Sequence, residues 1–254
     1  MEMQYFRQFS PALGRDMECK VYGSGGRPVL FIPCQNGRFF DFEDFHMADT
    51  WSPWINGRKV MVFSIDTIDQ ETWSNTTGDP AWRIRRHEDW VRYITDEMVP
   101  FIWQMVQRRT GQREIPGILT FGCSLGATHA ANLYFRRPDL FNGMLALSGI
   151  YTAEYGFGSY MDDLVYLNSP VHYMENLPED HPYIPIFNRQ RAVICVGQGD
   201  WERPETTFQM ADILRRKDIH TWVDIWGHDS IHDWPWWYQQ VTYFVPWLLR
   251  GEDC

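Results

Sequence analysis

The sequence predicts an α/β fold with a mainly parallel central sheet and helices on both of its faces. Short apolar runs, each bounded by Gly, Pro or Asp, alternate along the chain with segments of helical periodicity. The chain has 254 residues, of which 44 % are hydrophobic and 22 % are charged, so it is long enough for a sizeable core. Because no repeat, low-complexity tract or linker divides it, we expect a single domain over residues 1–254.

Eight segments are predicted as strands. Two lie near the N-terminus, before a turn at residues 23–26, and the later ones include continuous apolar runs typical of strands covered on both faces. The expected strands are, in chain order, Gln4–Ser10, Asp16–Tyr22, Val29–Ile32, Val60–Ile65, Ile118–Cys123, Met144–Ser148, Ala192–Val196 and Thr221–Ile225.

Helices are expected between these strands. Apolar residues from Trp90 to Met105 recur at spacings of three and four, which predicts an amphipathic helix. Pro100 should kink that helix, because proline lacks the amide hydrogen and crowds the preceding turn. The other expected helices are Leu125–Arg136, Thr206–Lys217 and Trp236–Arg250.

Two connections are long for a compact domain, namely residues 33–58 and 149–190. The second is rich in tyrosine and phenylalanine. It is predicted to be either a lid or pocket wall, or a surface excursion with its own small cluster.

The charge balance and the cysteines exclude several classes of protein. The 23 Lys and Arg against 33 Asp and Glu give a formal net charge of -10, which disfavours a nucleic-acid partner. No apolar stretch approaches the ~20 residues of a membrane span, and the N-terminus lacks a signal-peptide pattern. Five cysteines without a CxxC pair indicate neither a disulfide framework nor a zinc site, so we expect a cytoplasmic protein. The short basic groups are expected to be solvated helix faces: Arg83, Arg85, Arg86, Arg215, Arg216 and Lys217.

The strongest functional signal is Gly122-Cys123-Ser124-Leu125-Gly126, which fits the pattern G-x-S-x-G. It follows a predicted strand and opens a predicted helix, which is the context that a nucleophile elbow requires. The turn is so sharp that the positions two before and two after the serine have no room for side chains. It lifts the serine hydroxyl to a helix N-terminus, where the helix dipole favours negative charge. Ser124 is therefore predicted to be a nucleophile.

A serine nucleophile needs a general base, because a free hydroxyl is barely ionised at neutral pH. His232 lies after the last predicted strand and before the last helix, and His228 shares the same loop. His129 lies more than one turn past Ser124 on the same predicted helix and should point away from it. His129 and three others are expected to be ordinary surface or partly buried residues: His46, His172 and His220.

The third member should be an acid just after the strand that ends at Val196. Asp200 and Glu202 are both close enough to serve. The acid would hold the imidazole in its productive tautomer and stabilise its charged form. The order Ser124, then Asp200 or Glu202, then His232 is that of the α/β-hydrolases.

Two backbone amides should bind the oxyanion that forms on the attacked carbonyl. One is expected from Leu125, directly after the nucleophile. The other should come from the loop after the strand that ends at Ile32, and we assign it to the Gln35 backbone.

Over nearly its whole length, the chain resembles the esterase D-like branch of the α/β-hydrolases. That branch includes S-formylglutathione hydrolases, feruloyl and enterochelin esterases and mycolyltransferases. The landmarks are residues 9–15 (FSPALGR), residues 122–127 (GCSLGA) and residues 232–237 (HDWPWW). The last matches the H-x-W-x-x-W pattern at the mycolyltransferase base, which favours His232 over His228. The branch often places a Glu a few residues past Gly-x-Gly, which favours Glu202, whereas the general G-x-x-D pattern favours Asp200.

These residues predict a serine esterase that forms an acyl-enzyme on Ser124, acts on a small-molecule ester and needs no metal or organic cofactor. Three alternatives stay open. The same triad suits an acyltransferase or a small-peptide hydrolase, and the fold could be a catalytically silent binding module. His228 and His232, four residues apart, could share a metal if they lay on one helix, although the serine motif would then be unexplained.

The pocket is expected to be aromatic, because Trp201 and Trp234 flank the acid and the base. The alternative is that these rings pack the last helix onto the sheet, and the aromatic content is equally compatible with a homo-oligomer interface. The net negative charge mildly disfavours an anionic substrate. Asp66 and Asp69 lie at the same sheet edge as the nucleophile and are expected either to contact a polar or cationic substrate group or to cap local turns.

Overall fold

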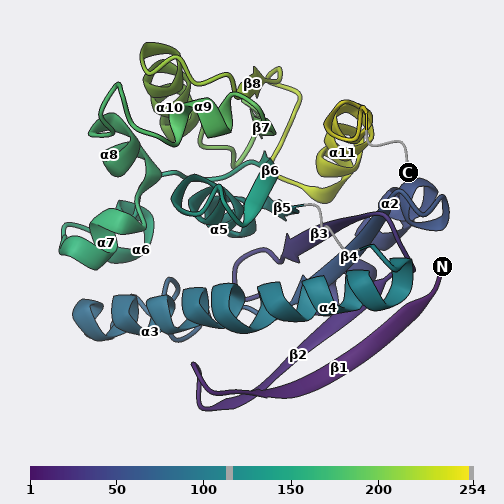
Figure 1. Cartoon of the computed structure of the whole chain (residues 1–254). Helices are drawn as coiled ribbons and strands as arrows, with labels where there is room; N and C mark the ends of the chain where they lie inside the picture. The colour runs from purple at the N-terminus through teal and green to yellow at the C-terminus, as the bar shows by residue number, and fades with distance from the viewer. Residues whose placement is uncertain (113–116, 252–254) are drawn as a thin grey trace.

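The described strands form one eight-stranded sheet in the order β1-β2-β4-β3-β5-β6-β7-β8 (Figure 1). The structure is a computed structural model that describes residues 1–112 and 117–251. β1 and β2 pair antiparallel, β2 pairs antiparallel with β4, and the pairs from β4 to β8 are parallel. This confirms the predicted fold class. The strands are β1 (Met3–Ser10), β2 (Arg15–Tyr22), β3 (Arg27–Ile32), β4 (Val60–Ile65), β5 (Ile118–Cys123), β6 (Phe141–Leu147), β7 (Arg191–Val196) and β8 (Trp222–Ile225).

Alternate residues of the central strands point to two different cores, which explains their continuous apolar sequences. On β4, Met61 and Phe63 face one core, whereas Val60 and Val62 face the other. The first core is closed by α3 (Pro80–Arg92), α4 (Val99–Thr110), α5 (Leu125–Arg136) and α10 (Glu205–Arg216). The second is closed by α2 (Met47–Asn56) and α11 (Trp234–Leu248), which lie near each other in Figure 1. Both faces of the central parallel strands, β3 to β7, are therefore shielded from water, as a parallel sheet requires.

Both long connections contain helices that the sequence analysis did not predict. Residues 33–58 hold α1 (Asp41–Asp44) and α2, and α2 buries Met47, Trp51 and Ile55 at helical spacing. Residues 149–190 hold four short helices: α6 (Glu154–Phe157), α7 (Asp163–Leu167), α8 (Pro170–Glu175) and α9 (Ile184–Phe187). Helices of four to six residues are too short to show a periodicity, which is why these were missed.

Near Pro100, where a kink was expected, the helix changes type. The helix that begins as α3 continues as a π-helical segment, η1 (Tyr93–Met98), before α4 begins at Val99. Pro100 thus lies in the first turn of α4, where its missing amide hydrogen costs no hydrogen bond within α4.

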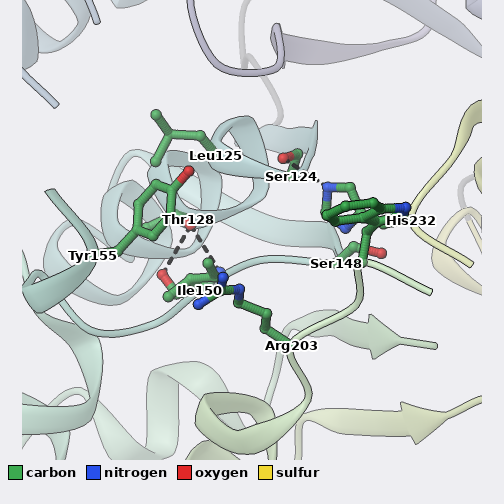
Figure 2. Close-up of a pocket in the computed structure, with 9 residues that line it drawn as sticks. Ser124, Leu125, Thr128, Ser148, Ile150, Tyr155, Arg203 and His232 are labelled. Atoms are coloured by element: carbon green, nitrogen blue, oxygen red, sulfur yellow. Dashed lines mark hydrogen bonds between the residues drawn. The ribbon is translucent and has the colours of Figure 1, made fainter. Parts of the chain in front are cut away.

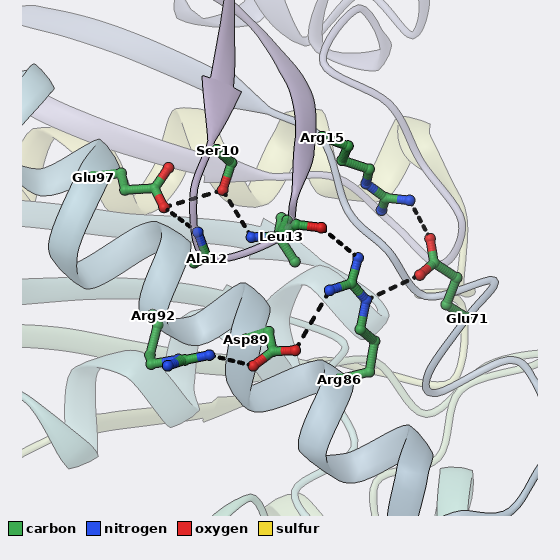
Figure 3. Close-up of polar contacts among 9 residues, drawn as sticks. All are labelled: Ser10, Ala12, Leu13, Arg15, Glu71, Arg86, Asp89, Arg92 and Glu97. Carbon is green, nitrogen blue, oxygen red and sulfur yellow. Dashed lines mark hydrogen bonds and ion pairs between the residues drawn. The ribbon is translucent and has the colours of Figure 1, made fainter.

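Polar contacts fasten the turn between β1 and β2 to this long helix (Figure 3). Glu97 Oε1 accepts hydrogen bonds from Ser10 Oγ at 3.0 Å and from the Ala12 amide at 2.9 Å. About three turns earlier on the helical run, Arg86 donates to the Leu13 carbonyl at 2.9 Å and pairs with Glu71. The two antiparallel strands are thereby held against the first core.

The expectation that Arg83 lies on a solvated helix face is wrong. Its side chain is buried and donates to the carbonyls of Thr72 at 2.7 Å and Gly156 at 2.6 Å. Arg83 therefore joins α3 to the segment that holds α6. No helix among the described residues is long and apolar enough to cross a membrane. Cys123 and Cys195 are buried in β5 and β7, and burial raises the pKa of both thiols.

Candidate active site

Ser124 occupies a tight turn between β5 and α5. Its backbone lies at φ 56° and ψ -130°, which is uncommon for a residue with a side chain. A Cβ atom on Gly122 would come within 2.3 Å of the Gly126 backbone, and one on Gly126 within 2.3 Å of the Ile32 carbonyl oxygen. Only glycine fits at both positions, which is the steric reason for the G-x-S-x-G spacing.

His232 reaches Ser124 from the segment between β8 and α11. Its Nε2 lies 2.9 Å from Ser124 Oγ, and its Nδ1 lies 3.1 Å from Glu202 Oε2. The imidazole side chain keeps 24 % of its surface exposed, whereas the Glu202 side chain keeps 1 %. The structure thus brings three of the predicted residues into one hydrogen-bonded series.

Glu202, not Asp200, meets the imidazole. Besides His232, the Glu202 carboxylate accepts the Ser148 hydroxyl at 2.6 Å and the Gly197 amide at 3.2 Å. The Asp200 residue is exposed and contacts His232 through its backbone, since its carbonyl accepts the His232 amide at 3.0 Å. Asp200 therefore positions the segment that carries the imidazole.

Two residues that the sequence analysis did not place in the site support Glu202. Ser148, directly after β6, has a positive φ of 57° and donates to the carboxylate. Trp237 on α11 donates its indole N–H to Ser148 Oγ at 2.9 Å, and its ring lies edge to face with His232 at 5.1 Å. Trp237 is the last Trp of the H-x-W-x-x-W run, so that pattern held a signal for this contact.

The backbone that follows β3 approaches the N-terminus of α5, since a Cβ atom on Gly126 would come within 2.4 Å of the Pro33 carbonyl oxygen. Leu125 opens α5, so its amide belongs to the first turn, where amides have no intrahelical acceptor. The Gln35 amide has no acceptor among the described residues. The Gln35 side chain is held by Ser74 Oγ at 2.7 Å and by the Tyr155 hydroxyl at 2.9 Å.

A cavity of about 120 Å³ opens beside the Ser124 hydroxyl. Figure 2 shows the lining side chains: Ser124, Leu125, Thr128, Ser148, Ile150, Tyr155, Arg203 and His232, with Trp201 completing the wall. Tyr155 comes from α6, so part of the 149–190 segment forms a wall of the cavity. Trp234 lies outside it and stacks on Phe45 at 4.6 Å.

The other candidate histidines lie elsewhere. His228 is exposed in the loop before α11, and its Nδ1 lies 3.3 Å from the Gln198 carbonyl oxygen. The surface pairs are His46 with Asp49 and His220 with Asp218, while His172 lies 2.6 Å from Ser169 Oγ. No group of three or more His, Cys, Asp or Glu in the described chain could hold a metal ion.

His129 differs from its expected place at or near the surface. It is 2 % exposed, and its Nε2 lies 3.0 Å from Asp69 Oδ1. Asp69 also accepts the Asn36 amide at 3.2 Å, and Asp66 accepts the Phe39 amide at 3.0 Å. Both aspartates therefore bind the loop after β3 and line no part of the cavity beside Ser124.

The comparisons with known proteins concern the family and the fold. The sequence matches the model of a family described as "Putative esterase" over residues 10–248. Among solved structures, a ferulic acid esterase is 15 % identical, covers 98 % of each chain and has a TM-score of 0.75. An S-formylglutathione hydrolase from Agrobacterium tumefaciens is 14 % identical over 99 % of this chain and 95 % of that chain, with a TM-score of 0.74. The fluorophosphonate-binding serine hydrolase FphF from Staphylococcus aureus is 14 % identical over 98 % and 99 % of the two chains, with a TM-score of 0.71.

The chain has the α/β-hydrolase fold. Because the family model spans most of its length, the chain belongs to this esterase family. No curated protein matches the sequence.

Proposed function

We propose that the protein is a serine carboxylic-ester hydrolase whose catalytic triad is Ser124, His232 and Glu202. The observation that carries the proposal is the unbroken series from the Ser124 hydroxyl through both ring nitrogens of His232 to the Glu202 carboxylate, with spacings of 2.9 Å and 3.1 Å. The first distance is within the range in which a nucleophile and its base can exchange a proton, and the second is within hydrogen-bond reach of an acid that orients the base.

In the first half of the reaction, Ser124 Oγ attacks the ester carbonyl while His232 Nε2 takes the hydroxyl proton. The carbonyl oxygen becomes an oxyanion, and the amides of Leu125 and Gln35 stabilise it. When the tetrahedral intermediate collapses, the bond to the alcohol oxygen breaks and His232 returns its proton to that oxygen. The acyl group stays on Ser124 as an ester.

In the second half, His232 takes a proton from water, and the hydroxide attacks the acyl-enzyme. Collapse of the second intermediate releases the carboxylic acid and returns the proton to Ser124 Oγ. Glu202 holds Nδ1–H throughout and stabilises the imidazolium that forms twice per cycle. Its own position is supported by Ser148, Gly197 and, through Ser148, by Trp237.

The test is to trap the acyl-enzyme. An activated aryl acetate is mixed with the protein, the reaction is quenched in acid within milliseconds to seconds, and the intact mass and the modified peptide are determined. We expect steady ester hydrolysis and a single acetyl group on Ser124. Hydrolysis by a Ser124→Ala variant at the wild-type rate, or acetylation at another residue only, would contradict the proposal.

A further inference from the structure

The short segment between β7 and α10 faces two ways. Glu202 turns inward, where its carboxylate is engaged by His232, Ser148 and Gly197. Its two neighbours, Trp201 and Arg203, turn to the other side and line the cavity beside Ser124. The segment that supplies the proposed triad acid therefore also supplies part of the substrate-facing wall.

Trp201 is held in an unfavourable arrangement that its packing does not explain. Its backbone has a φ of 67°, which bulky residues seldom adopt. Its side chain is 88 % exposed, the largest exposure among the large hydrophobic residues of the described chain. A strained backbone and an exposed indole at the mouth of a catalytic cavity point to a surface that is covered when a ligand binds.

Arg203 brings a positive charge to the same wall. Within residues 1–112 and 117–251, its guanidinium has no hydrogen-bond or ion-pair partner, and no carboxylate lines the cavity. Glu202, the adjacent acid, already accepts three hydrogen bonds and faces away. Figure 2 shows the Arg203 side chain extending toward Ile150, so that the guanidinium lies away from His232 and leaves the Ser124 hydroxyl open.

The backbone of Arg203 is restricted before any ligand arrives. The next residue is Pro204, at the start of α10, and a residue that precedes proline is largely confined to extended conformations. A cation on a restricted backbone loses less conformational freedom on binding than one on a flexible loop, which favours a role in recognition.

We propose that the cavity accepts esters that carry an anionic group, and that Arg203 binds this group while Trp201 covers it. The proposal rests on the proposed ester hydrolysis at Ser124 and names its substrate class. The cavity of about 120 Å³ restricts the anionic arm to a short chain. The formal charge of -10 disfavours anions at long range, so selection for them depends on this unpaired guanidinium at contact distance.

The experiment compares each anionic ester with a neutral ester of nearly the same shape. For a charge on the acyl arm, monoethyl glutarate is compared with ethyl 5-oxohexanoate. For a charge on the alcohol arm, the butyrate ester of 4-hydroxybutanoate is compared with that of 5-hydroxy-2-pentanone. The ratio of kcat/KM for the anionic over the neutral ester is measured by product chromatography for wild type and for Arg203→Gln. Arg189→Gln is the matched control, because Arg189 is an exposed arginine that does not line the cavity.

We expect wild type to prefer the anionic ester by roughly ten- to hundredfold on one of the two arms, as for a hydrogen bond to a charged group. The preference should disappear in Arg203→Gln, persist in Arg189→Gln and weaken as salt is added. Neutral esters hydrolysed without a preference on either arm, or a preference that survives Arg203→Gln, would overturn the substrate class and leave the proposed hydrolysis standing. If neither kind of ester is hydrolysed, the proposed function itself fails.

Discussion

Two histidine–carboxylate pairs lie close to the helix that follows Ser124, and their nitrogen–oxygen distances are almost equal. His232 and Glu202 are 3.1 Å apart, and His129 and Asp69 are 3.0 Å apart. The His232 side chain is 24 % exposed and touches Ser124, whereas the His129 side chain is 1 % exposed and lies against three buried rings, those of Trp73, His87 and Trp90. The comparison teaches that a histidine–acid pair serves catalysis only where a nucleophile and a route to solvent are added.

The buried pair has a different task in this fold. Asp69 holds His129 of α5 with one carboxylate oxygen and the Asn36 amide with the other. Asn36 follows the proposed oxyanion donor Gln35 and has a positive φ of 62°. The pair therefore ties the helix that begins after Ser124 to the loop that should supply the second oxyanion amide.

The largest difference between the two pairs should follow from removing the proposed reacting groups. Ser124→Ala and His232→Ala should each lower kcat by about 10⁴- to 10⁶-fold, because the remaining site keeps only oxyanion binding and substrate contacts. Steady-state ester hydrolysis and thermal unfolding are measured on the same preparations. A folded Ser124→Ala protein that retained more than a few per cent of the wild-type kcat would refute the assignment.

Replacing each candidate acid by its amide distinguishes Glu202 from Asp200. Glu202→Gln should lower kcat by about 10⁴-fold, since a neutral amide stabilises neither the productive tautomer nor the imidazolium. Asp200→Asn should stay within about threefold of wild type, because Asp200 contacts His232 only through its backbone carbonyl. The reverse ranking in kcat would make Asp200 the working acid.

Disrupting the buried pair should damage stability more than chemistry. His129→Asn leaves the Asp69 carboxylate without its imidazole partner, and we expect a loss of about 3 kcal/mol in the free energy of unfolding. The loss in kcat should be about tenfold, because displacement of the Asn36 segment would misplace the neighbouring Gln35 amide. Urea unfolding and kinetics are both required here. A 10⁴-fold loss of kcat with unchanged stability would contradict a structural role for the His129–Asp69 pair.

The smallest expected effect concerns the pH dependence of stability near the buried pair. Burial, and then the neighbouring His129, lower the pKa of His87 well below 6.5. The folded protein therefore keeps His87 neutral while the unfolded chain binds a proton below about pH 6.5. This contribution to stability is fully present above pH 6.5 and is lost as the pH falls below it. Unfolding free energies from pH 8 to pH 5 should fall less steeply for His87→Leu than for wild type, and an equal slope would contradict this reading.

Local patterns were enough to predict the elements on which the site is built. The predicted bounds of β4, β5 and α5 agree with the structure, because buried strands and the glycine-flanked elbow leave strong signals in short stretches of sequence. The helices in 149–190 were not predicted, since each ends within two turns and, of the four, α7 alone has a side-chain cap, Asp162 accepting the Val165 amide.

What the sequence left open depends on contacts between distant segments. Asp200 and Glu202 both lie within six residues of the end of β7. Ser148, fifty-four residues before Glu202, distinguishes them by donating to Glu202. The full burial of His129 cannot be predicted locally, because its partner Asp69 lies sixty residues away in the sequence. Four of the positive-φ residues, Asn36, Ser124, Ser148 and Trp201, gather around the site, where tertiary contacts and not local propensity set the backbone.

The central claim is that Ser124 is the serine activated by His232 and that the buried pair activates none. Labelling by a fluorophosphonate, followed by intact mass, tests it on the folded wild type, Ser124→Ala, His232→Ala and His129→Asn. We expect one adduct on wild type, none on Ser124→Ala, labelling of His232→Ala slowed by at least about 10³-fold, and prompt labelling of His129→Asn. Labelling of Ser124→Ala at the wild-type rate, or no adduct on wild type at all, would contradict it.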